Sequence, residues 1–87
     1  MSEQTVADKV INIFAQFKKV SPDEIKMETT FEELGFDSLD GLNLVFELEE
    51  EFDIVVPDDK VQSMRSVREV VVGVESLVAA KAAEAGA

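Results

Sequence analysis

Few side chains in this 87-residue sequence could do chemistry, because it contains neither Cys nor His. Disulfides, Cys/His zinc sites, a thiol nucleophile and an imidazole base are therefore excluded. The remaining candidate is Ser38, in the stretch Asp37-Ser38-Leu39-Asp40 at the start of a predicted helix. Free backbone N–H groups and the positive end of the helix dipole favour an anion at that place. A phosphodiester on the Ser38 hydroxyl would therefore be well placed.

Ser38 taken alone has two other interpretations. An Asp-Ser-Leu stretch in front of a helix is most often a plain N-cap. A catalytic serine needs a base to take its proton, and no base accompanies Ser38 in the sequence. We therefore predict no catalytic residue, and a serine hydrolase is the least favoured class.

Acidic residues are concentrated in the middle of the sequence. Between Lys26 and Lys60 there are twelve acids and no Lys or Arg, whereas the rest has seven acids and eight bases. The middle therefore carries −12 and the remainder +1, which gives the net charge of −11. Such a segment repels nucleic acid and anionic lipid and attracts basic protein surfaces, although acids also serve solubility alone. We expect protein partners with basic patches, and neither nucleic acid nor membrane.

An acidic, cation-responsive binding domain without a prosthetic group is a further alternative. An EF-hand is excluded, because with Gly41 as its turn glycine the first and third ligand positions would be Phe36 and Ser38. Diffuse cation binding by the acids beside Ser38 or by the run 49–51 stays open. No specific metal site is predicted.

Helical periodicity predicts the elements that position Ser38. Apolar residues at helical spacing predict helices over about 3–17 and 38–52, and Asp58 can cap a short helix through residue 64. The capping box that begins at Ser66 opens a last helix, although the Val-rich run 70–73 is also typical of a strand. Period and cap favour helix there.

Residues 18–37 would form a long loop between the first two helices. Capping boxes at Ser21 and Thr30 predict two short helical turns in it, with Gly35 as a left-handed C-cap after Leu34. The predicted fold is all-α: a small four-helix bundle, with three principal helices plus one short helix and a long ordered loop. Residues 1–80 form the domain and 81–87 an Ala-rich tail that should fray.

The helix over 38–52 has two predicted sides. The buried side consists of Leu42, Val45, Leu48 and Phe52. The opposite side carries Asp40, Glu47 and Glu51. Glu49 projects among the apolar positions, where it can extend past the edge of the core. Leu39 and Phe46 lie where the two sides meet, so they serve either core packing or a contact surface.

The stretch from Gly35 to Ile54 resembles the acyl carrier proteins of dissociated fatty acid synthesis and related pathways. The Leu-Gly-x-Asp-Ser-Leu core of the family occupies residues 34–39, an acidic run precedes Phe52, and Pro57-Asp58 follows the stretch at the usual distance. The likeness extends over nearly the whole chain. It implies that a phosphopantetheinyl transferase attaches 4'-phosphopantetheine from coenzyme A to Ser38. The thiol of this arm then holds an acyl group as a thioester, which agrees with the absence of Cys.

The resemblance also assigns roles to other residues. Beside Ser38, it implies that Asp37 and Leu39 border the cofactor. The implied partner-binding residues are Asp37, Leu39, Asp40, Phe46, Glu47, Glu50, Glu51 and Asp58. The implied acyl-pocket residues are Leu42, Val45, Phe46, Ile54, Val61 and Met64. The implied partners, besides the transferase, are acyl-carrier synthetase, ketosynthase, reductase, dehydratase or acyltransferase enzymes, and the carrier itself is a non-catalytic monomer.

Three residues depart from the commonest pattern of the family. Gly41 replaces a hydroxyl or Ala-like residue, Asn43 an acid, and Phe46 a Met. A specialised carrier in a lipid or polyketide pathway is therefore as compatible with the sequence as a fatty-acid one. Carriers of aminoacyl groups, which resemble Gly-Gly-x-Ser at this place, are disfavoured. The polar start and the lack of an apolar stretch of ~20 residues predict a cytoplasmic protein.

Overall fold

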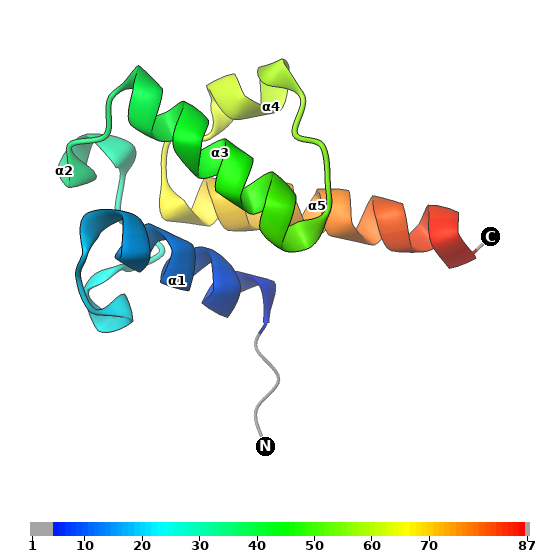
Figure 1. Ribbon diagram of the computed structural model, residues 1–87, viewed down its shortest axis with the longest axis horizontal. Coiled ribbons are helices and arrows are strands. Elements are labelled where there is room, and N and C mark those ends of the chain that lie inside the picture. Colours follow the sequence, from blue (N-terminus) through cyan, green and yellow to red (C-terminus); the bar gives the residue numbers. More distant parts are fainter. Residues whose placement is uncertain (1–4, 87) are drawn as a thin grey trace.

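The computed structural model describes the backbone of residues 5–86 and the side chains of residues 5–83, and it is built of helices (Figure 1). In chain order these are α1 (Val6–Lys18), the 3-10 turn η1 (Pro22–Glu24), α2 (Phe31–Leu34), α3 (Ser38–Phe52), α4 (Asp58–Ser63) and α5 (Val67–Gly86). The long helices α1, α3 and α5 with the short α4 form the bundle, and η1 and α2 lie in the connection between α1 and α3. The predicted all-α fold is confirmed.

Side-chain caps set where α1, η1, α2 and α3 begin. The predicted cap by Asp58 was wrong, because Asp58 is the first residue of α4 and Pro57 before it offers no side-chain acceptor. Thr5 caps α1, because its hydroxyl accepts from the Asp8 N–H while the Asp8 carboxylate accepts from the Thr5 N–H. The helix therefore starts at Val6, whereas the predicted start at Glu3 lies outside the described residues. Ser21 and Thr30 cap their turns as predicted.

The connection between α1 and α3 is tied to the start of α5. The Phe31 N–H donates to the Arg65 carbonyl and the Val67 N–H donates to the Thr29 carbonyl, each at 2.9 Å, and Thr30 forms an antiparallel bridge with Ser66. These bonds satisfy backbone groups that would otherwise need water. They make the segment an ordered part of the fold, as predicted.

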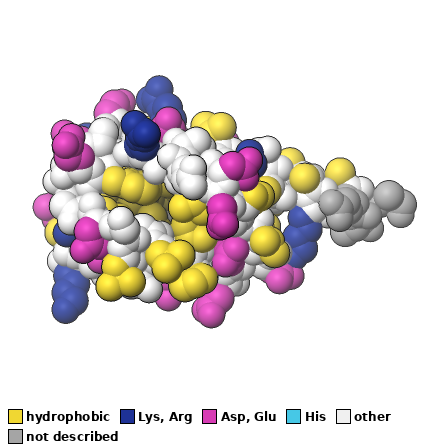
Figure 2. All heavy atoms as spheres, turned by 90° about the horizontal axis from the view of Figure 1, so that it is seen from above, with side chains coloured by type: hydrophobic (Ala, Val, Ile, Leu, Met, Phe, Trp, Pro, Cys, Tyr) yellow, Lys and Arg dark blue, Asp and Glu magenta, His cyan; other side chains and the backbone are white. Residues whose placement is uncertain are grey.

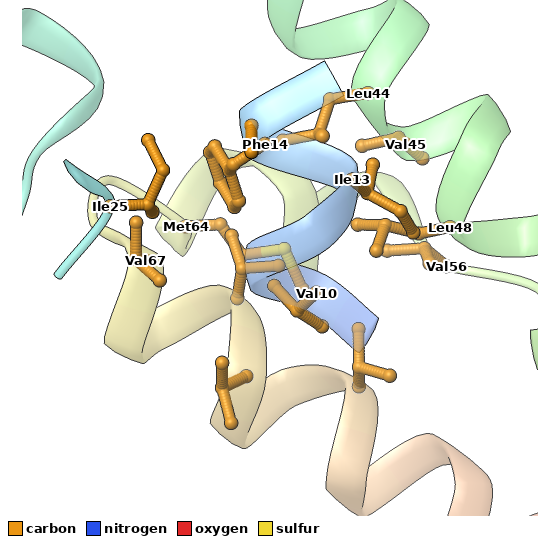
Figure 3. Packing of buried hydrophobic residues seen from close by; sticks show 14 of the residues in the cluster. Val10, Ile13, Phe14, Ile25, Leu44, Val45, Leu48, Val56, Met64 and Val67 are labelled. Carbon is orange, nitrogen blue, oxygen red and sulfur yellow. The ribbon is translucent and has the colours of Figure 1, made fainter. Parts of the chain in front are cut away.

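The core lies where α1 packs against both α3 and α5 (Figure 3). Its largest fully buried side chains are Phe14, Leu44, Leu48, Val10, Val67, Val70 and Val74. One prediction on α3 was wrong: Leu42 is 47% exposed, and Leu44, at 1%, takes the buried position. Apolar residues occur around more than half of the circumference of α3. Helical periodicity alone is therefore compatible with more than one buried face, and the predicted face was turned away from α1.

The Val-rich run 70–73 is helical, as the cap at Ser66 indicated. Gly73 has a packing role there, because a Cβ at this position would lie only 2.6 Å from the terminal methyl of Met64. The helix then continues to Gly86, so residues 81–86 belong to α5, and the predicted division at residue 80 does not coincide with a helix end. Fraying of residues 81–87 in solution stays a prediction, although the contact of Lys81 with Asp53 opposes it at residue 81.

Candidate functional site

Ser38 occupies the first turn of α3, and Asp37 rather than Ser38 is the N-cap. The Asp40 N–H donates to the Asp37 carboxylate at 2.8 Å, and the Asp37 N–H donates back to the Asp40 carboxylate at 3.4 Å. These reciprocal bonds form a capping box around Ser38. The Ser38 side chain is exposed, and within the described residues its hydroxyl forms no hydrogen bond. The hydroxyl is thus left free for chemistry by its neighbours.

A cluster of phenylalanines holds the segment that leads into Ser38. The Phe36 ring lies 5.7 Å from that of Phe14, 5.4 Å from Phe31 and 6.0 Å from Phe17, measured between centroids. The Phe36 N–H donates to the Phe31 carbonyl, which closes the turn around Gly35, where φ is +73°. Such ring pairs add to the stability that burial alone supplies. Phe36 therefore fixes the chain two residues before Ser38, a role that the sequence only hinted at.

The Asp37 cap supports a quantitative prediction. Asp37→Ala should lower the free energy of unfolding by about 1 kcal/mol, because the Asp40 N–H loses its acceptor at the start of α3. Urea denaturation of the unmodified protein measures the change. Asp37→Asn, which keeps a side-chain acceptor, should cost only a small part of it. Equal losses for both variants would show that the capping geometry does not matter.

The face of α3 beside Ser38 combines exposed apolar and acidic side chains. Leu39 is 63% and Phe46 53% exposed, and Leu42 lies between them on the same stripe. The flank toward α1 carries Glu47 and Glu51, which share a surface hollow with Lys9. Glu50 and Asp58 are also exposed, and Asp40 is half-buried. Figure 2, seen from the side of the molecule where α3 and α4 lie, shows hydrophobic side chains in contact with solvent among acidic ones.

The predicted acyl-pocket residues divide into two groups. Val45, Ile54 and Met64 are buried in the core, and Val61 packs against it. Leu42 and Phe46 are instead about half exposed. An alkyl chain lying along both groups would therefore pass from the surface of α3 into the core.

The Glu49 carboxylate, expected beyond the core edge, accepts a hydrogen bond at 2.9 Å from the N–H of Val56. It thereby fastens the chain that follows α3. Sequence spacing gave no signal for this bond, since it joins residues seven positions apart.

No cluster of three or more acidic side chains that could hold a metal ion occurs among the described residues. None of the helices there is long and apolar enough to span a bilayer. The site consists of the exposed Ser38, the capping acids Asp37 and Asp40, and the exposed apolar stripe on α3 formed by Leu39, Leu42 and Phe46.

Comparison with known proteins gives the site its context. The sequence matches the family described as phosphopantetheine attachment site over residues 8–71, which include Ser38. It is also 39% identical over 72 residues to an acyl carrier protein of Chlorobium phaeovibrioides, an alignment that covers 82% of this chain and 92% of the relative. The chain belongs to the acyl carrier protein family. Its predicted role, carrying acyl groups in fatty acid or related biosynthesis, is thereby confirmed.

Two further matches agree with membership of the acyl carrier protein family. A mitochondrial acyl carrier protein of Dictyostelium discoideum is 39% identical over 71 residues, covering 82% of this chain but only 59% of the relative. The crystal structure of an acyl carrier protein from Thermotoga maritima matches with a TM-score of 0.67 at 27% identity, over 88% of this chain and 95% of that one.

The cofactor of the acyl carrier protein family is covalently attached 4'-phosphopantetheine, and the site fits it. The free, exposed hydroxyl of Ser38 is the kind of group that can form a phosphodiester. The first turn of α3 offers backbone N–H groups and a positive dipole end to the phosphate. The Asp37 and Asp40 carboxylates each accept a hydrogen bond from a backbone N–H at the start of α3. Members of this family act as carriers of the attached group.

Proposed function

We propose that Ser38 is the residue that carries the 4'-phosphopantetheine arm. The observation that carries this assignment is the exposed hydroxyl in the first turn of α3, between the two residues of one capping box. The Ser38 oxygen would form a bond to phosphorus of the coenzyme A pyrophosphate, and the adenosine bisphosphate part would leave. The hydroxyl proton would go to a base of the phosphopantetheinyl transferase, since this chain contains no His and the Asp37 and Asp40 carboxylates beside Ser38 accept the hydrogen bonds of the capping box.

The arm supplies a terminal thiol that holds the acyl group as a thioester, and this chain supplies the surfaces that are recognised. The exposed residues Leu39 and Phe46 would contact apolar patches of partner enzymes, with acids around them meeting basic residues. Exposed ion pairs contribute about 0 to 1 kcal/mol each, so binding should be fast, brief and salt-sensitive. Such binding suits a carrier that visits the transferase and then several enzymes of acyl synthesis in turn.

The proposal predicts a modification that can be located on the chain. Incubation with coenzyme A, Mg²⁺ and a broad phosphopantetheinyl transferase should raise the intact mass by one arm. Trypsin should then release residues 27–60 as one peptide, because Lys26 and Lys60 bound a stretch free of Lys and Arg. Ser38 is the one serine of that peptide. Lack of any mass gain, under conditions that modify another acyl carrier protein, would overturn the proposal.

Reversal of one charge on α3 tests the partner surface. Glu47→Lys should slow transfer to partner enzymes several-fold at low salt, because a repulsive pair replaces an attractive one. Glu47 is a better choice than Asp40, whose carboxylate also belongs to the capping box. The test measures the initial rate at which the phosphopantetheinyl transferase, one of these partners, attaches the arm, at several salt concentrations. The matched control is Glu75→Lys, which makes the same change of charge at an exposed site on α5. Equal rates for the two variants would exclude an acidic recognition face on α3.

The remaining features of the carrier stay predictions. These are the acyl pocket between the helices, the monomeric state and the cytoplasmic location. The name of the Dictyostelium relative places that protein in mitochondria. Fractionation of cells that express this chain would decide its own compartment.

A further inference from the structure

The C-terminal part of α5 holds the chain that follows α3. The Lys81 ammonium donates hydrogen bonds to both the backbone carbonyl and the carboxylate of Asp53, which lies 28 residues earlier. Lys81 lies outside residues 8–71, the part of the chain that matches the family. Membership of the family therefore does not account for this contact.

The chain that Lys81 holds is the α3–α4 loop, residues 53–57. Asp53 adopts a left-handed conformation with φ of 54°, which is unfavourable for a residue with a side chain. The next residues turn back onto the bundle: Ile54 and Val56 are buried and Val55 between them is exposed. Their backbone is tied to Glu49, whose carbonyl accepts from the Ile54 N–H and whose carboxylate accepts from the Val56 N–H.

The loop is thus fastened from two sides, by Glu49 of α3 and by Lys81 of α5. The hydrogen bond from Lys81, together with its charge, lowers the pKa of the Asp53 carboxyl below its ordinary value. The carboxyl is therefore ionised at neutral pH, where the pair can form.

A surface hollow of about 350 Å³ lies between this loop and α5. Ile54, Val55, Leu77 and Ala80 line it, and Asp53 and Lys81 stand beside them. Ile54 also belongs to the buried core and to the residues proposed for the acyl pocket. It therefore separates the hollow from the core, so a loop that moves away at Ile54 would open the core on this side.

We propose that Lys81 is a positioning residue that latches the α3–α4 loop shut, and that this latch sets how readily the core opens to an acyl chain. The second half of this statement rests on the proposed function, whereas the latch itself does not. The pair is largely exposed, so its removal should raise the open population by about fivefold at most. A weak latch suits a carrier, because cargo must enter and leave repeatedly.

Amide hydrogen exchange of the unmodified protein tests the latch. In Lys81→Ala the Ile54 and Val56 amides should exchange about three- to fivefold faster, with Leu44 and Val74 amides unchanged as core references. Lys81→Arg should restore the slow rates, and Lys26→Ala should leave them unaltered as the matched loss of one lysine. Unchanged loop amides, or the same acceleration at the core references, would overturn the latch.

The link to cargo needs protein that carries the arm on Ser38. Attachment of an octanoyl group to the arm should raise the melting temperature more in Lys81→Ala than in the parent, because the entering chain no longer competes with the latch. Equal increases would overturn the link to cargo. Failure of Ser38 to take the arm would instead overturn the proposed function, and the exchange result would still stand.

Discussion

Ser38→Ala is expected to abolish attachment of the arm completely while leaving the fold intact. Attachment is lost because the substitution removes the accepting oxygen. The fold should persist because Asp37, not Ser38, caps α3, and because the Ser38 hydroxyl makes no hydrogen bond within the described residues. Alanine is also the most favourable residue inside a helix. The variant should therefore unfold at the same urea concentration as the parent, or slightly higher.

Intact mass and circular dichroism together test this expectation. Ser76→Ala is the matched control, since it removes another exposed serine from a helix and should leave the mass gain unchanged. A mass gain that persists in Ser38→Ala would move the attachment site elsewhere. A variant that gains no mass but has lost its helical signal would contradict the assignment of the cap to Asp37.

Phe14→Ala is expected to have the largest effect on stability. Phe14 is fully buried, and its ring lies 5.7 Å from those of both Phe31 and Phe36. Truncation of such a side chain costs about 3 to 5 kcal/mol, and native domains have only about 5 to 15 kcal/mol in total. A domain of this size should lie near the lower limit, so much of the variant should be unfolded at 37 °C.

Thermal and urea denaturation measure this loss. Phe46→Ala is the control, because it removes the same ring from an exposed position on α3 and should cost less than about 1 kcal/mol. Because the Phe36 ring packs against Phe14 and fixes the chain before Ser38, the folded fraction of Phe14→Ala should also accept the arm more slowly than the parent. Equal stability of the two variants would contradict the place of Phe14 in the buried core.

Helix positions were predictable because several local signals agree. The predicted helix over 38–52 has the observed bounds of α3, since the Asp-Ser-Leu stretch at its start, the apolar period and the following Pro57 all indicate them. The predicted start of α1, at about residue 3, lies outside the described residues. Thr5 and Asp8 form the cap before Val6, and their spacing is a capping pattern that the sequence contains.

The orientation of α3 was less predictable than its bounds. The six apolar residues from Leu39 to Leu48, counting both, fit more than one face, and the choice of Leu44 over Leu42 depends on how α1 packs against α3. Long-range polar contacts were hidden for a related reason. The bonds from the Val56 N–H to the Glu49 carboxylate and from the Lys81 ammonium to Asp53 depend on the fold, so no local pattern encodes them.

The pairing of residues 29–31 with 65–67 has a consequence for the time at which Ser38 becomes usable. The strand-like bonds that fix the segment before α3 join residues more than thirty positions apart, and such contacts form late in folding. A nascent chain emerges from the ribosome N-terminus first, so Ser38 leaves the ribosome before Arg65 and Val67 do. Until then the helix start has no fixed support. Attachment of the arm at the proposed site, Ser38, is therefore expected only after residues 65–67 have joined the fold.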